Sequence, residues 1–171
     1  ETQGSVSDYT TWKDSRFANI SFGYGIMTNS LQLAMAAAAI ANDGIRVKPQ
    51  LILSTTKESN LNGIRVISSK AAKAVTSLMI QDVASGTGKK AAINGITVAG
   101  KTGTAEKVDS KTGRDNKNLN VSSFVGFAPA EAPEIVALVV IDEPQGIAYG
   151  GVVAAPAFKE IVPAALLKQG L

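Results

Sequence analysis

The residues with the clearest chemical potential lie together in the run Lys101-Thr102-Gly103-Thr104. The lysine supplies a positive point charge, and the two threonines supply hydroxyl groups that can donate hydrogen bonds. Gly103 has no Cβ, so another backbone or a ligand can approach the chain closely there. Together these groups would hold a carboxylate through charge-assisted hydrogen bonds. We therefore interpret this run as a candidate anion-binding site.

The surrounding sequence predicts that this run lies on a strand. Residues 96–108 are mostly β-branched, small or polar, a composition that favours an extended backbone. A second Lys-Thr-Gly run occurs at Lys111-Thr112-Gly113, within a polar segment from Asp109 to Asn120 that is typical of a loop. We interpret this second copy as a chance match.

A nucleotide-binding loop is the main competing interpretation of the same residues. The segment from Gly95 to Thr102 matches the Walker A pattern, and the apolar run 135–142 ends in Asp142, as a Walker B strand does. A phosphate-binding loop needs a preceding strand and a helix that begins at the Lys-Thr pair. Here β-branched residues lie inside the supposed loop, and Gly103 and a polar loop follow it. The pattern favours the strand and leaves the phosphate-binding loop as the weaker alternative.

Composition narrows the possible chemistry. The 171 residues are 45% hydrophobic, which predicts one globular unit over 1–171. The net charge of +3 is scattered along the chain, so a nucleic-acid partner is not indicated. Cysteine and histidine are absent, so acid-base work would fall to Lys, Tyr, Asp or Glu. We predict no metal or other cofactor. The longest apolar stretch, Leu31 to Ala41, is too short to span a bilayer.

The remaining pattern predicts an α/β fold of the α+β type, with antiparallel sheet strands flanked by helices. Residues 1–22 show no clear period, and we expect them to be mostly irregular. Short connections such as 129–133 predict antiparallel neighbours. The predicted helices cover 30–42, 68–85 and the segment after Pro156, and the predicted strands cover 47–56, 63–67, 96–108, 121–128 and 134–141.

Six short motifs, taken in order, resemble the C-terminal half of the transpeptidase domain of class B penicillin-binding proteins. They are Phe22-Gly-Tyr-Gly, Leu31-Gln-Leu-Ala, Asn42-Asp-Gly, Gly100-Lys-Thr-Gly-Thr-Ala, Phe124-Val-Gly-Phe-Ala-Pro, and Tyr149-Gly-Gly with Ala155-Pro. The resemblance covers the chain from about Phe17 onward. It implies a partial serine β-lactamase/DD-transpeptidase fold. It also implies a membrane-anchored, extracytoplasmic enzyme that cross-links peptidoglycan and is acylated by β-lactams, with the anchor outside this chain.

The resemblance also implies roles for individual residues. Lys101, Thr102 and Gly103 would form the third signature of the family and line the active-site groove. Lys101 would attract the terminal carboxylate of a D-Ala-D-Ala stem peptide and orient a neighbouring serine hydroxyl. The hydroxyls of Thr102 and Thr104 would bind that carboxylate, and the Thr104 backbone N–H would be an oxyanion-hole donor. Gly103 would let substrate lie along the strand, and Tyr149 would contribute an aromatic wall.

Two signatures of the family are not found in a usable form. The sequence has no S-x-N, and S-x-x-K occurs only at Ser54-Thr55-Thr56-Lys57, where a strand-like run meets a turn instead of the start of a helix. We hypothesise that this is a fragment or one piece of a split chain, and that the N-terminal half of the domain supplies the nucleophilic serine, its lysine base and the first strands. The strand at 134–141 would then lack an outer partner, which predicts association with that half or with a second copy.

Two further interpretations stay open at this point. A serine β-lactamase-like hydrolase would share the fold and the third signature, and the residues that distinguish hydrolysis from transfer would precede Glu1. A catalytically incomplete binding or structural module would keep the fold without the nucleophile.

Overall fold

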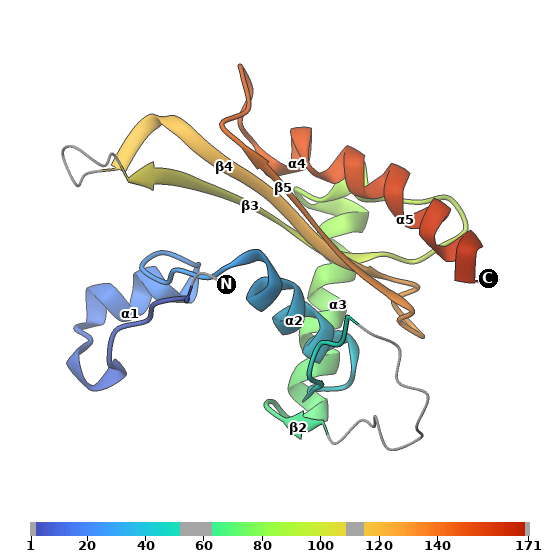
Figure 1. Cartoon of the computed structure of the whole chain (residues 1–171), viewed down its shortest axis with the longest axis horizontal. Helices are drawn as coiled ribbons and strands as arrows, with labels where there is room; N and C mark the ends of the chain where they lie inside the picture. Colours follow the sequence, from blue (N-terminus) through green and yellow to red (C-terminus); the bar gives the residue numbers. More distant parts are fainter. Residues whose placement is uncertain (1–2, 52–62, 109–114, 170–171) are drawn as a thin grey trace.

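The computed structural model describes residues 3–51, 63–108 and 115–169 (Figure 1). A three-stranded antiparallel sheet in the order β3-β4-β5 forms the centre, and β1 and β2 form a separate antiparallel pair. The elements are η1 (Tyr9–Thr11), α1 (Asp14–Ser21), α2 (Ser30–Ala41), β1 (Ile45–Arg46), β2 (Ile64–Arg65), α3 (Ser69–Ser85), η2 (Lys89–Ala91), β3 (Ala99–Val108), β4 (Asp115–Ala128), β5 (Ile135–Asp142), α4 (Gly150–Val153) and α5 (Ala155–Gln169). The predicted fold class is therefore confirmed.

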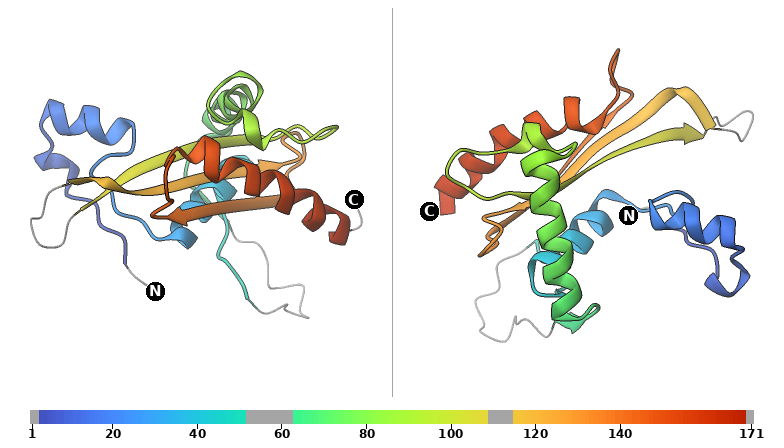
Figure 2. Two further views of the ribbon diagram at one scale, coloured as in Figure 1. Left: turned by 90° about the horizontal axis from the view of Figure 1, so that it is seen from above. Right: turned by 180° about the vertical axis from the view of Figure 1, so that it is seen from behind.

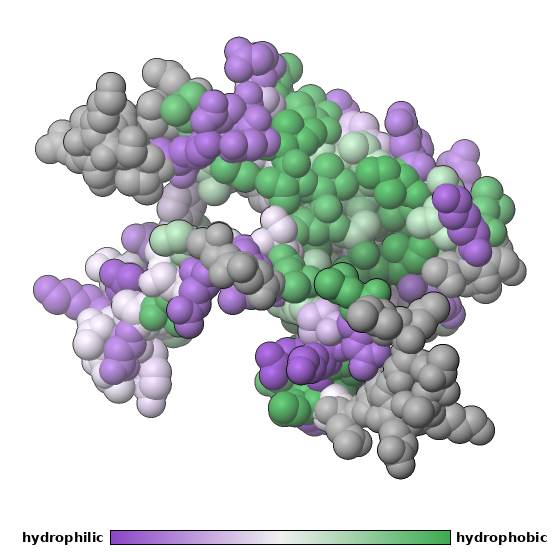
Figure 3. All heavy atoms as spheres, viewed as in Figure 1, coloured by the Kyte–Doolittle hydropathy of each residue, from purple (hydrophilic) through white to green (hydrophobic). Residues whose placement is uncertain are grey.

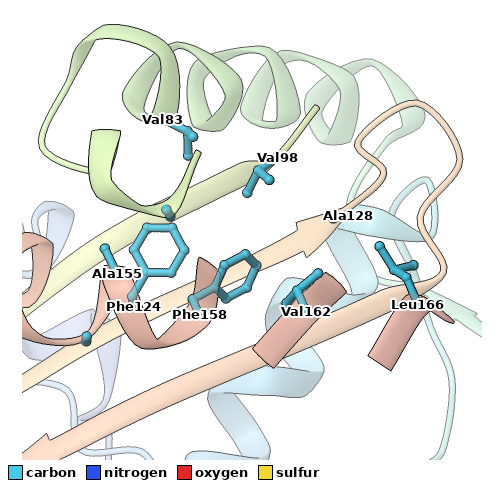
Figure 4. Packing of buried hydrophobic residues seen from close by; sticks show 10 residues of the cluster. Val83, Val98, Phe124, Ala128, Ala155, Phe158, Val162 and Leu166 are labelled. Atoms are coloured by element: carbon cyan, nitrogen blue, oxygen red, sulfur yellow. The ribbon is translucent and has the colours of Figure 1, made fainter. Parts of the chain in front are cut away.

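Helices cover both faces of the sheet. Helix α5 packs against one face of β4 and β5, α2 packs against the other face, and α3 lies beside β3 (Figure 2). Under α5, the rings of Phe124 and Phe158 meet edge to face, with centroids 4.9 Å apart, and pack with Val162 in the larger core (Figure 4). Under α2, Phe127 packs with Met79 of α3. These two cores fix β3 and β4, which carry the predicted site.

Local sequence signals set the helix ends as predicted. Asn29 accepts from the backbone N–H of Gln32, whose side chain accepts from the Asn29 backbone in return, so α2 begins with a capping box. It ends before Asp43 and Gly44, which both adopt a positive φ. Ser68 caps α3 by accepting from the backbone N–H of Ala71.

The structure corrects three of the predicted elements. Residues 14–21 form α1, which stands apart from the sheet (Figure 1), although no period was evident there. Strand β4 begins at Asp115, so 115–120 is strand and not loop, because β3 supplies its hydrogen-bond partners beyond a bulge at Glu106/Lys107. Residues 47–51 of the predicted 47–56 strand lie in no strand; the rest of that range is outside the described residues.

The outer side of β5 leaves apolar surface open. Among the described residues, β5 pairs only with β4, and Val140 on it is 44% exposed. Hydrophobic residues gather over the β5 and α5 side of the molecule in Figure 3. Ile161 on α5 is 53% exposed. None of the helices in the described residues is long and apolar enough for a membrane span.

Candidate functional site

Strand β3 presents the predicted run in extended conformation. Thr102 lies opposite Phe124 of β4, and Thr104 lies opposite Ser122. Because side chains alternate along a strand, Thr102 and Thr104 share one face of the sheet, whereas Lys101 and Gly103 belong to the other. The strand continues through Lys101 and Thr102 with no helix beginning there. This geometry rules out the interpretation of residues 95–102 as a phosphate-binding loop.

Glycines let β3 fit closely against its neighbours. A Cβ on Gly100 would lie 2.2 Å from Phe124 Cζ, and one on Gly103 would lie 2.5 Å from Ser123 Oγ. A side chain at Gly100 would therefore collide with the main core, and one at Gly103 would force Ser123 to move.

The two threonines face an open groove of about 390 Å³. Tyr149, which is 69% exposed, lies at the same groove, so the structure brings Thr102, Thr104 and Tyr149 together. The lining residues include two lysines and no carboxylate; they are Gly86, Thr87, Lys89, Lys90, Thr102, Thr104, Tyr149, Gly150, Gly151 and Val152. A groove with this lining favours an anionic ligand.

Lys101 is not among the residues that line the groove, and its side chain contacts the next residue, Thr102. Its Nζ donates to the carbonyl oxygen of Thr102 at 2.8 Å and to Thr102 Oγ1 at 3.3 Å. The ammonium group therefore lies next to the hydroxyl that faces the groove, and Lys101 remains exposed. The positive charge and the hydroxyl group are therefore adjacent.

Helix α4, which begins directly after Tyr149, packs against β3. The backbone N–H of Gly150 donates to Thr104 Oγ1 at 3.2 Å. A Cβ on Gly151 would lie 2.2 Å from the carbonyl oxygen of Thr87, so α4 can approach the segment that follows α3 this closely only with glycine at position 151. Tyr149 is the residue that precedes α4, and its place at the groove follows from these contacts.

Sequence reasoning missed Thr87 and Asp82. Thr87 Oγ1 lies 2.7 Å from Thr102 Oγ1 and donates to Asp82 Oδ1 at 3.0 Å. Thr87 follows the predicted helix 68–85 and stands between Gly86 and Gly88; a threonine between two glycines is suited to a closely approached loop and is the one signal that could have indicated it.

The far end of β3 carries an ion-pair cluster. Lys107 Nζ lies 2.7 Å from Glu143 Oε1 and 3.0 Å from Asp142 Oδ1. The hydrogen bonds to Glu143 and then to Asp142 raise the pKa of Lys107. These charges fasten β3 to the end of β5.

No group of side chains suited to a metal ion occurs in the described ranges. Ser54 and Lys111–Gly113 lie outside those ranges.

Comparison with known proteins shows which family this geometry belongs to. The sequence model of the penicillin binding protein transpeptidase domain matches residues 1–163. The chain belongs to this transpeptidase family. It is 41% identical over 169 residues to the probable peptidoglycan D,D-transpeptidase PenA of Neisseria flavescens, across 97% of this chain and 41% of that protein. It is 35% identical over 164 residues to the stage V sporulation protein D of Bacillus subtilis, across 90% of this chain and 25% of that protein.

Solved structures of the family match the fold. The transpeptidase domain of Burkholderia pseudomallei penicillin-binding protein 3 aligns with a TM-score of 0.86 at 37% identity, covering 98% of this chain and 50% of that one. Penicillin-binding protein 3 of Mycobacterium tuberculosis, complexed with ampicillin, aligns with a TM-score of 0.88 at 32% identity, covering 100% of this chain and 41% of that one. The chain therefore spans half or less of the length of these relatives.

Proposed function

We propose that this chain forms one wall of the active site of a peptidoglycan DD-transpeptidase, which cross-links stem peptides through a serine acyl-enzyme and binds β-lactams. The observation that carries the proposal is the adjacency of the Lys101 ammonium and the Thr102 hydroxyl beside a groove lined without carboxylates. The D,D-transpeptidase names of relatives and the ampicillin complex of a solved relative also support it.

The proposed ligand is a D-Ala-D-Ala stem peptide or a β-lactam, each with a free acidic group. Lys101 provides the positive potential for that group, and the hydroxyls of Thr102 and Thr104 bind it. The Thr104 backbone N–H is one oxyanion-hole donor. Gly103 leaves room for the ligand to lie along β3 as an added strand, and Tyr149 forms the aromatic side of the groove.

Acylation requires a nucleophilic serine in an S-x-x-K signature, and the described part of the chain contains no such signature. We assign the S-x-x-K serine with its lysine, and the S-x-N signature, to an N-terminal half of the domain. The first strands of that half would pair with the open side of β5, where Val140 is exposed. The site would act on the outer face of the membrane, and the anchor would lie outside this chain.

Labelling with a fluorescent penicillin tests this proposal. In the intact protein, peptide mapping should place the label on a serine outside the 171 residues, and prior incubation with unlabelled ampicillin should prevent labelling. Covalent labelling of this chain alone, at Ser54 or elsewhere, would contradict the proposal. Rapid loss of the label by hydrolysis would favour the β-lactamase-like alternative instead.

A further inference from the structure

A chain of hydrogen bonds joins the Lys101 cation to a carboxylate behind the groove. Lys101 Nζ lies 3.3 Å from Thr102 Oγ1. Thr102 Oγ1 lies 2.7 Å from Thr87 Oγ1, which in turn lies 3.0 Å from Asp82 Oδ1. Two hydroxyl groups thus connect a positive group at the edge of β3 with a negative group on α3.

The charges at the two ends set the direction of every bond in this chain. A carboxylate accepts hydrogen bonds and an ammonium group donates them. The single hydroxyl proton of Thr87 is therefore donated to Asp82, and the Thr87 oxygen accepts the hydroxyl proton of Thr102. The Thr102 oxygen accepts from Lys101. The proton of Thr102 consequently points toward Thr87 and away from the groove.

The surroundings hold Asp82 and Thr87 in place. Asp82 Oδ1 also accepts the backbone N–H of Thr87 at 3.2 Å, and the Asp82 carbonyl oxygen accepts from the N–H of Gly86 at 2.9 Å. Asp82 Oδ2 is buried without a hydrogen-bond partner in the described part of the chain, and a Cβ on Gly88 would lie 2.7 Å from it. Oδ2 is therefore enclosed, and Oδ1, held by the Thr87 N–H, gives the Thr87 hydroxyl proton a fixed acceptor.

We propose that Thr87 and Asp82 are positioning residues that control the Thr102 hydroxyl and thereby the selectivity of the groove for carboxylates. This inference rests on the proposed role of Thr102 in carboxylate binding. A ligand carboxylate can accept from Thr102 only if that hydroxyl turns away from Thr87, so each binding event gives up one internal hydrogen bond. A ligand without the acidic group imposes no such exchange. Thr87 therefore weakens recognition of the carboxylate selectively.

Thr87→Val and Thr87→Ser test this role in the intact protein. The rate constants for acylation by ampicillin and by its methyl ester are measured for each variant, and their ratio removes any general effect on the fold. Valine cannot accept the Thr102 proton, so the acid-to-ester ratio should rise about fivefold, which corresponds to a net hydrogen bond of about 1 kcal/mol. Serine keeps the hydroxyl and should leave the ratio unchanged. A ratio that is unchanged or lower in Thr87→Val overturns the inference.

Neutron diffraction from deuterium-exchanged crystals without ligand tests the bond direction itself. The deuteron on Thr102 Oγ1 should lie on the line to Thr87 Oγ1. A deuteron that points into the groove overturns the inference, whatever the kinetics show. If the deuteron lies toward Thr87 but the unsubstituted protein reacts equally with ampicillin and its ester, the bond direction stands and the proposed carboxylate site is contradicted.

Discussion

The backbone N–H of Gly150 donates a hydrogen bond to the Thr104 hydroxyl at 3.2 Å, across 46 residues of sequence. Thr104→Val would leave this part-buried N–H without its acceptor, at a cost of about 1 kcal/mol in the free energy of unfolding. It would also release the start of α4 and hence Tyr149. We expect a lower Tm and slower acylation by penicillin. Thr104→Ser keeps the oxygen and serves as the control; equal losses in both variants would argue against this role.

The edge-to-face pair Phe124 and Phe158 holds α5 on the sheet, and both rings are fully buried. Phe158→Ala should lower the free energy of unfolding by about 3–5 kcal/mol, because it removes buried contacts and leaves a cavity. Ile161→Ala on the same helix should have a much smaller effect, since Ile161 is 53% exposed. Urea denaturation measures both variants. Similar losses would show that the core is not centred on Phe158.

Asp43 links the end of α2 to the start of α3. Ser69 Oγ donates to Asp43 Oδ1 at 2.5 Å, and this bond is the main reason that the pKa of Asp43 is lowered from 3.8; Lys73 and Arg65 also lower it. A lowered folded-state pKa means that the stabilisation is present above 3.8 and is lost as the pH falls through the folded-state value.

Ser69→Ala should therefore lower the Tm near neutral pH, and the difference from the unsubstituted protein should shrink in acid. Ser77→Ala is the matched control, because Ser77 on the same helix donates to the Lys73 carbonyl within that helix. Thermal unfolding followed across an acid titration measures both. A difference for Ser69→Ala that stays constant with pH would contradict this assignment.

The open side of β5 predicts association, because an unpaired apolar edge is a template for another strand. We expect this chain, prepared by itself, to form dimers or larger species as its concentration rises. Val140→Lys should suppress that association, since Val140 lies on β5 and is 44% exposed. Leu167→Lys, on α5 and 74% exposed, should leave it largely unchanged. Light scattering over a concentration series decides this; a monomer at every concentration would contradict it.

Local signals made part of this structure predictable. The Asn29 capping box and the Asp43-Gly44 stop lie within a few residues of the ends that they set. The extended run at Lys101 was predictable because β-branched residues surround it. Residues 115–120 were not, because their polar composition indicates a loop and only pairing with β3 makes them a strand. A local sequence pattern does not show which strands pair over long distances in the sequence.

The candidate site was also predictable only where its residues are close in sequence. Lys101, Thr102 and Thr104 are adjacent in sequence, so their chemistry could be inferred together. Thr87 reaches Thr102 across 15 residues, and Gly150 reaches Thr104 across 46, through the packing of α3 and α4 on β3. No spacing rule encodes those contacts.

In the proposed function, Lys101, and not the lysine of the second Lys-Thr-Gly run, recognises the acidic group of the ligand. The most direct measurement is the rate of acylation of the intact protein by fluorescent penicillin in Lys101→Met and Lys111→Met. Because charge-assisted hydrogen bonds contribute about 1.5–3 kcal/mol, Lys101→Met should react about 10- to 100-fold more slowly. Lys111→Met should react at the unsubstituted rate. Equal rates for Lys101→Met and the unsubstituted protein, or a loss confined to Lys111→Met, would show that Lys101 does not recognise the acidic group.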